Sequence, residues 1–318
     1  MAATSAERQS CLSMSSSALL QWHSVRRGSG RPLLLVHGLG GSRRSWRLVI
    51  DALAAQREVI AIDLPGFGCT PALSGDASIR RLADALTEYL QASGLIGIDA
   101  VGSGMGARLL LELASRGGVV GAVVALAPSG FAKGWERAVH FISTLLFNHL
   151  LRLMQPVLPF IAGHAWARAL LLAQLSAHPA RLPAQLVLEE LRSRTASTSL
   201  NKLLFDLAFG EKAPGAAQGS MRSELLIGWG RYDRVCLPRQ AMRTLSAFPD
   251  AQLHWFADSG HYPQWDTPQQ IVRLILERSP GLSLALAPPA APRVARSPHS
   301  IFDNSSGLVA PHPPPSAL

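Results

Sequence analysis

The sequence predicts an α/β domain in which helices cover both faces of a mostly parallel sheet, with further helices inserted between two strands. Two observations lead to this fold class. Short apolar runs alternate with longer amphipathic runs along the chain, as they do in parallel α/β proteins. Some runs are apolar throughout, such as residues 120–126, which indicates strands that are buried on both faces of the sheet.

The predicted strands are short apolar runs, most of which end close to a glycine, a proline or an aspartate. They span residues 33–36, 59–63, 98–101, 119–127, 224–229 and 252–256. The predicted helices carry apolar residues at helical spacing. They span residues 43–55, 78–91, 105–116, 238–248 and 268–278. Either Asp76 or Ser78 can cap the second helix.

The strand–helix alternation stops between residues 131 and 220, where the chain is rich in Leu, Ala and Arg. This segment follows the end of a strand, which is where open α/β sheets bind ligands. We therefore predict a helical cap, inserted in a core of residues 19–130 and 221–279. Residues 1–18 and the Pro/Ala-rich residues 280–318 are expected to be disordered, because such composition buries too little apolar area.

Apolar side chains recur in the first half of the predicted cap. They are Phe141, Leu145, Leu146, Phe147, Leu150, Leu153 and Met154. One interpretation is that they line a site for a small apolar molecule. The other is that they only pack the cap onto the core, as apolar stripes usually do.

The formal net charge is +9, carried by 27 arginines and only three lysines. The arginines are scattered and form no basic stripe, so we expect no binding to nucleic acid. The three cysteines form no C-x-x-C pair, which argues against a metal site and a disulfide framework. No metal and no cofactor are expected.

No basic segment followed by a long apolar region begins the chain, so a secretory signal is not expected. The most apolar long stretch, residues 141–163, contains Arg152 near its middle and prolines at 156 and 159. These residues argue against an integral membrane segment. We therefore expect a cytoplasmic protein. The sequence does not determine its oligomeric state.

Five short motifs lie at or near strand ends in a fixed order. They are His37-Gly38-Leu39-Gly40-Gly41-Ser42, Asp63-Leu64-Pro65-Gly66-Phe67-Gly68, Gly102-Ser103-Gly104-Met105-Gly106, Gly228-Trp229-Gly230-Arg231-Tyr232-Asp233 and Gly260-His261-Tyr262-Pro263. With these motifs the chain resembles the α/β-hydrolase superfamily, in particular its single-domain members with a helical cap. The resemblance covers residues 19–279.

The resemblance implies an acid at Asp233 and a base at His261, in the chain order that this fold requires. It also implies that the backbone N–H groups of Leu39 and Met105 hold a developing oxyanion. Gly38 and Gly104 would let the backbone approach a ligand closely. His37 and Asp63 belong to the family motifs, and we interpret both as structural.

One position departs from the family pattern. The middle residue of a G-x-Ser-x-G turn carries the nucleophile, and members have a Ser, Cys or Asp there. In this chain the position is Gly104, which has no side chain. Ser103 lies one residue earlier, and adjacent side chains on a tight turn point in different directions, so we expect Ser103 Oγ to face away from the apex.

Four hypotheses follow. In the first, Asp233 orients His261, which acts as a general base on a water or an acidic substrate proton, so that the chain hydrolyses a small apolar ester-like substrate. In the second, Ser103 is a displaced nucleophile. In the third, the chain is a pseudo-hydrolase that binds a small apolar ligand or a protein partner. In the fourth, glycine at position 104 is an engineered or inactivating change in an ordinary hydrolase.

Five further histidines have no metal-ligand spacing and are interpreted as ordinary lid or surface residues. They are His140, His149, His164, His178 and His254.

Overall fold

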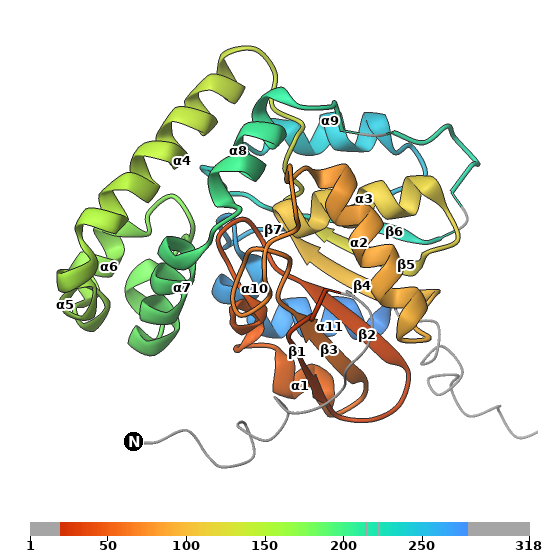
Figure 1. Ribbon diagram of the computed structural model, residues 1–318, viewed down its shortest axis with the longest axis horizontal. Helices are drawn as coiled ribbons and strands as arrows, with labels where there is room; N and C mark the ends of the chain where they lie inside the picture. Colours follow the sequence, from red (N-terminus) through yellow and green to blue (C-terminus); the bar gives the residue numbers. More distant parts are fainter. Residues whose placement is uncertain (1–19, 214, 222, 279–318) are drawn as a thin grey trace, which may run out of the picture. The chain divides into compact units, whose positions relative to one another are not determined.

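The computed structural model describes residues 20–213, 215–221 and 223–278, which belong to one compact unit. The segments that the sequence predicts to be disordered, residues 1–18 and 280–318, lie outside the described residues. The described part is an α/β structure in which helices lie on both faces of a single sheet (Figure 1). This confirms the predicted fold class.

The sheet has seven strands in the order β1-β3-β2-β4-β5-β6-β7. The strands are β1 (Ser24–Arg27), β2 (Pro32–Val36), β3 (Glu58–Ile62), β4 (Ile98–Ser103), β5 (Val120–Leu126), β6 (Leu225–Gly230) and β7 (Gln252–Phe256). All neighbours are parallel except β1 and β3. The six predicted strands are present, each with ends within two residues of those expected.

Strand β1 was not expected from the sequence. It pairs antiparallel with β3 at the edge of the sheet, with Ser24 opposite Ile62. Its four residues, Ser24–Arg27, are mostly exposed, so the apolar run that marks the buried strands is missing. An exposed edge strand is held by backbone hydrogen bonds to the neighbouring strand. Such bonds do not require particular side chains, so the amino-acid composition does not reveal the strand.

Alternating side chains of the central strands enter two separate cores. Leu34 and Val36 pack with α2 (Ile79–Ala92), α3 (Met105–Arg116) and α9 (Arg239–Ala247). The neighbouring residues Leu33 and Leu35 point to the other face. There they pack with α1 (Ile50–Ala54) and α11 (Pro268–Glu277). The period of two residues therefore explains why these strands are apolar throughout.

The predicted helices at residues 78–91, 105–116, 238–248 and 268–278 are present with nearly the same ends. Ser78 is the cap of α2, because its side chain accepts a hydrogen bond from Arg81 N. The prediction of one helix over residues 43–55 is wrong. The chain forms a short 3-10 helix, η3 (Arg43–Trp46), capped by Ser42, and then starts α1 at Ile50.

Only helices occur between β5 and β6 among the described residues, as the sequence analysis expects. They are α4 (Trp135–Leu153), η4 (Gln155–Val157), α5 (Leu158–Gly163), α6 (Ala165–Leu171), η5 (Pro179–Arg181), α7 (Ala184–Ala196) and α8 (Leu200–Phe209). We call residues 131–220 the helical insert. The structure groups the insert and the sheet in the same compact unit.

Within the described ranges, no single helix is both long and apolar enough to cross a membrane. One bent pair, α4 together with residues 155–163, does pass by length and composition, with a bend of 72° between its two parts.

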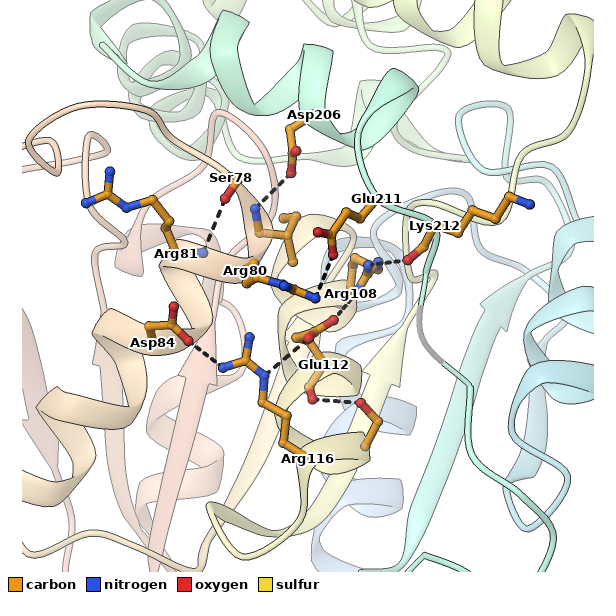
Figure 2. Close-up of polar contacts among 12 residues, drawn as sticks. Ser78, Arg80, Arg81, Asp84, Arg108, Glu112, Arg116, Asp206, Glu211 and Lys212 are labelled. Carbon is orange, nitrogen blue, oxygen red and sulfur yellow. Dashed lines mark hydrogen bonds and ion pairs between the residues drawn. The ribbon is translucent and has the colours of Figure 1, made fainter.

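Polar contacts attach the end of the insert to α2 and α3 (Figure 2). Asp206 of α8 accepts a hydrogen bond of 2.8 Å from Ile79 N, at the first turn of α2. The buried guanidinium of Arg108, in α3, donates to Lys212 O, and Arg80 pairs with Glu211. Because these bonds satisfy a helix N-terminus and a buried cation, they fix the point at which the insert rejoins the core.

Candidate active site

Gly104 lies at the apex of the turn between β4 and α3, with φ +55° and ψ −110°. Residues with a side chain rarely adopt this conformation. The two flanking glycines are also required by space. A Cβ on Gly106 would come within 2.4 Å of Val36 O, and one on Gly102 would come within 2.6 Å of Ala107 N. The turn therefore has the tight strand-to-helix geometry of a nucleophile elbow, with no side chain at its apex.

His261 faces this apex. A Cβ built on Gly104 would lie 3.2 Å from Nε2 of His261 and 3.8 Å from Oγ of Ser129. On its other side, Nδ1 of His261 is 2.9 Å from Oδ2 of Asp233. The imidazole is thus held between a carboxylate and the place where a nucleophile would project. The structure brings Asp233, His261 and Gly104 together as the sequence analysis expects.

Asp233 follows the end of β6 and is almost completely buried. Its second oxygen, Oδ1, accepts hydrogen bonds from Val235 N at 2.8 Å and Cys236 N at 2.9 Å. Both oxygens therefore have partners, which stabilises the ionised carboxylate and fixes its orientation. A carboxylate held in this way selects the tautomer of His261 that carries its proton on Nδ1 and leaves Nε2 free to accept one.

Leu39 and Met105 both line the cavity that contains His261. Met105 is the first residue of the twelve-residue helix α3, and the first N–H groups of a helix have no partner inside the helix. Neither the N–H of Leu39 nor that of Met105 donates to an acceptor in the part of the chain that the structure describes. Both groups are therefore free to hold negative charge, as the resemblance implies for an oxyanion.

Gly38 and Ser103 lie next to these donors in the sequence, Gly38 directly before Leu39 and Ser103 two residues before Met105. A Cβ on Gly38 would be 3.2 Å from Ser103 O, so a larger residue would crowd the turn. Ser103 itself is completely buried, and its Oγ accepts a hydrogen bond of 3.1 Å from Gln264 Nε2. It does not line the cavity with His261. This placement disfavours Ser103 as a displaced nucleophile.

His37 and Asp63 have structural partners. Leu64 N donates to His37 Nε2 at 3.0 Å, and His37 Nδ1 lies 2.8 Å from Gly38 O. The ring is therefore neutral, with its proton on Nδ1, and burial lowers its pKa. Asp63 accepts from the backbone N–H groups of Arg43 and Cys69 and pairs with the Arg43 side chain. These bonds support the structural interpretation of both residues.

The cavity at His261 has a volume of about 30 Å³. The core lines it with Leu39, Met105, Ser129, Val235, His261 and Tyr262, and the insert lines it with His140, Thr144, Phe147, Gln174, Leu175 and Arg194. The insert therefore covers the end of the sheet at which the predicted site residues meet. Four of the six side chains that the insert contributes to the lining are polar.

This lining corrects the expectation about the apolar residues of the insert. Of the seven residues proposed to line a ligand site, only Phe147 reaches the cavity. Four leucines, Leu145, Leu146, Leu150 and Leu153, are exposed, so they do not pack on the core either. The reason is the rotation of α4, whose buried side chains include Glu136, Thr144 and Asn148.

His140 was interpreted from the sequence as an ordinary lid residue, and this interpretation is wrong. It lies on the inner side of α4 and lines the cavity with His261. Burial, together with the nearby charges of His261 and Arg194, lowers the pKa of His140 to about 4. The ring is thus neutral near pH 7 and can donate or accept one hydrogen bond at the site.

Arg194 is a further residue that the sequence analysis missed. It comes from α7, yet its Nη1 donates to Leu39 O at 2.9 Å and its Nε donates to Asn148 Oδ1 at 2.6 Å. Burial lowers the pKa of its guanidinium. Arg194 therefore ties the loop that carries the Leu39 N–H to two helices of the insert. Only long-range contacts reveal this, because no motif surrounds Arg194 in the sequence.

No group of three or more His, Cys, Asp or Glu side chains that could hold a metal ion occurs among residues 20–213, 215–221 and 223–278.

A family model described as alpha/beta hydrolase fold matches residues 31–268, which is well over half of the chain. The chain belongs to the α/β-hydrolase family. This α/β-hydrolase is 27% identical over 265 residues to an uncharacterized protein of Mycobacterium tuberculosis, covering 78% of the chain and 75% of that protein. It is 35% identical over 72 residues to the pimeloyl-(acyl-carrier protein) methyl ester esterase of Legionella pneumophila, covering 23% of the chain and 30% of that protein.

Among solved structures, an esterase from Exiguobacterium antarcticum is similar to this α/β-hydrolase with a TM-score of 0.63 and 17% sequence identity. The match covers 81% of the chain and 95% of the esterase. At this identity the likeness supports the fold and does not carry over a substrate.

Proposed function

We propose that this α/β-hydrolase cleaves a small ester by general-base catalysis, with water as the nucleophile and Asp233 and His261 as the dyad. The observation that carries the proposal is the position of His261 Nε2, which faces the empty apex at Gly104 while Nδ1 is held by Asp233. A relative named as a methyl ester esterase supports the choice of reaction class.

The reaction balances with one water and no cofactor. The water oxygen forms a bond to the ester carbonyl carbon while His261 Nε2 takes one of its protons. The carbonyl oxygen becomes an oxyanion, which the N–H groups of Leu39 and Met105 stabilise. The tetrahedral intermediate then breaks its bond to the alcohol oxygen, and the imidazolium of His261 returns the proton to that oxygen. The products are an acid and an alcohol.

The size of the site limits the substrate. A cavity needs roughly 10–15 Å³ to hold a water, so about 30 Å³ accommodates on the order of two waters. An ester therefore enters only when the inner face of α4, with His140 and Phe147, moves outward. This favours short acyl and alcohol groups over long chains.

The test is hydrolysis of short-chain aryl esters by the purified chain, with His261→Ala and Asp233→Asn compared with the native protein. General-base catalysis contributes about 10²–10⁴-fold, so His261→Ala is expected to lower kcat by at least about 10²-fold. His149→Ala is the matched control, because His149 is an exposed histidine of α4. Unchanged turnover in His261→Ala would refute the proposal.

A second candidate function is ligand binding without turnover. It is favoured by one observation: the apex residue Gly104 has no side chain, and the hydroxyl of the neighbouring Ser103 is already bonded to Gln264. Under this alternative the two oxyanion donors hold a carboxylate or carbonyl ligand. Steady turnover by the pure protein that is lost in Asp233→Asn would exclude it.

A further inference from the structure

The outer face of α4 carries a continuous apolar stripe. Its exposed side chains recur every three or four residues, which places them on one side of the helix. They are Trp135, Val139, Ile142, Leu146, Leu150 and Leu153. Leu146 and Leu153 are 66% and 67% exposed. Figure 1 shows α7 and α8 on one side of α4 only.

A surface helix ordinarily buries its apolar face. In α4 the apolar face is exposed instead. The buried side of α4 includes Glu136, Thr144 and Asn148, and His140 and Thr144 line the cavity. Glu136 forms ion pairs with Arg239 and Arg243. The inner side of α4 is thus occupied by polar contacts, and most of its large apolar side chains are left on the outside.

The exposed apolar surface continues past the end of α4. Phe160 of α5 and Trp166 of α6 are exposed, with ring centroids 6.2 Å apart, and Leu170 is 78% exposed. Monomeric soluble proteins rarely expose contiguous apolar surface of this kind unless it contacts a partner or a membrane. We call the stripe of α4 together with these three residues the outer apolar face.

The charged residues around this face indicate which kind of partner it binds. Between residues 133 and 188 the chain has five basic residues and a single acid, Glu136. Glu136 is buried and neutralised by its two arginines. The exposed Lys, Arg, Asp and Glu side chains of this stretch are therefore all positive. Lys133 lies two residues before α4 begins, and Arg152 precedes Leu153 at its end.

We propose that the outer apolar face binds the surface of an anionic lipid membrane, with α4 lying in the plane of the interface. Apolar side chains with exposed tryptophans and flanking basic residues are the features that bind helices to such surfaces. A second copy of the chain fits less well. In a two-fold dimer this face would meet its own copy, so two surfaces that carry the same basic residues would face each other. Binding to the membrane does not depend on the reaction proposed above.

The test is co-flotation of the full chain with vesicles of phosphatidylcholine alone or of phosphatidylcholine mixed with phosphatidylglycerol. The native protein is expected to float with the anionic vesicles and to be released as salt is raised. The double variant Leu146→Ser, Leu153→Ser is expected to bind at least about tenfold more weakly, because two apolar side chains no longer enter the interface. Lys133→Gln with Arg152→Gln is expected to weaken binding to anionic vesicles by roughly fivefold per charge.

Met242→Ser is the matched control, because Met242 is an exposed apolar residue of α9, outside this face. It is expected to float like the native protein. Near-UV circular dichroism and the unfolding midpoint verify that each variant is folded. As a second measurement, lipids with brominated acyl chains are expected to quench the tryptophan fluorescence of the native protein, and less so after Trp135→Phe and Trp166→Phe.

Failure of the native protein to bind either vesicle would overturn the proposal. So would binding that the leucine variant leaves undiminished. Sedimentation equilibrium tests the alternative that a second copy of the chain covers the face. A dimer that the leucine variant dissociates, in a protein that does not float, would show that a second copy covers the face.

Discussion

A Cβ on Gly104 would lie 3.2 Å from Nε2 of His261, the ring atom opposite the one held by Asp233. The site therefore retains the geometry of a nucleophile, base and acid with the nucleophile side chain missing. The relationship also makes the role of position 104 experimentally accessible, because a side chain introduced there points directly at the base.

Gly104→Ser is expected to create a nucleophile. Its hydroxyl would lie beside His261, provided that the ring yields by a few tenths of an ångström, and acyl-transfer activity should rise by at least about 10²-fold. The serine must adopt φ +55°, so the free energy of unfolding is expected to fall by about 1–3 kcal/mol. Ester turnover, labelling with a fluorophosphonate and chemical unfolding measure these effects.

Gly104→Ala is the matched control, because it introduces the same backbone strain without a hydroxyl. It should lose similar stability and remain unlabelled. A serine variant that stays inert, although folded, would argue against the idea that the glycine only inactivates an ordinary hydrolase.

Ser103→Ala is expected to leave ester turnover unchanged. The Ser103 hydroxyl is bonded to Gln264 and lies outside the cavity, so its loss removes one buried hydrogen bond and about 1 kcal/mol of stability. Steady-state kinetics and urea unfolding measure the two quantities. Loss of turnover without loss of structure, together with an adduct at Ser103 in a fluorophosphonate-treated sample of the native protein, would restore the displaced-nucleophile hypothesis.

Glu190 is expected to make stability depend on pH. Burial raises the pKa of this carboxyl to about 7 from its ordinary value of 4.5. Above pH 4.5 the unfolded chain releases the proton while the folded chain retains it, so stability falls as pH rises from 4.5 to 7 and then levels off. The fall is on the order of 3 kcal/mol, at about 1.4 kcal/mol per pH unit.

Glu190→Gln should remove this slope. The measurement is the free energy of unfolding of variant and native protein at several pH values. The difference between them isolates Glu190, because His140 contributes equally to both. An exposed carboxyl elsewhere, changed in Glu88→Gln, provides the control. Parallel curves for the Glu190 variant and the native protein would contradict the assignment.

Arg194→Met is expected to destabilise the chain by roughly 2–4 kcal/mol and to lower ester turnover. The change leaves Leu39 O and Asn148 Oδ1 without their donor and releases the loop that holds the Leu39 N–H. Arg192→Met, on the exposed side of the same helix, is the control and should behave like the native protein. If Arg194 only stabilised the fold, kcat per folded molecule would be unchanged.

Most of the fold could be predicted because it depends on local patterns. Buried strands such as residues 120–126 are marked by their apolar composition, and α3 by its helical spacing after a glycine turn. Strand β1 could not be predicted, because Ser24–Arg27 is an exposed edge strand held by backbone bonds to β3. The break between η3 and α1 could not be predicted either, because the helical spacing of apolar residues continues through it.

The sequence by itself determined the order of the motifs, and with it the places of Asp233, His261, Leu39 and Met105. Each stands at a strand or helix end, where local pattern and chain direction fix its position. Only the tertiary structure decided what faces them. The rotation of α4 brings His140 into the cavity and exposes its leucines, and Arg194 reaches Leu39 from 155 residues away. Such contacts depend on how the insert packs, which local spacing does not specify.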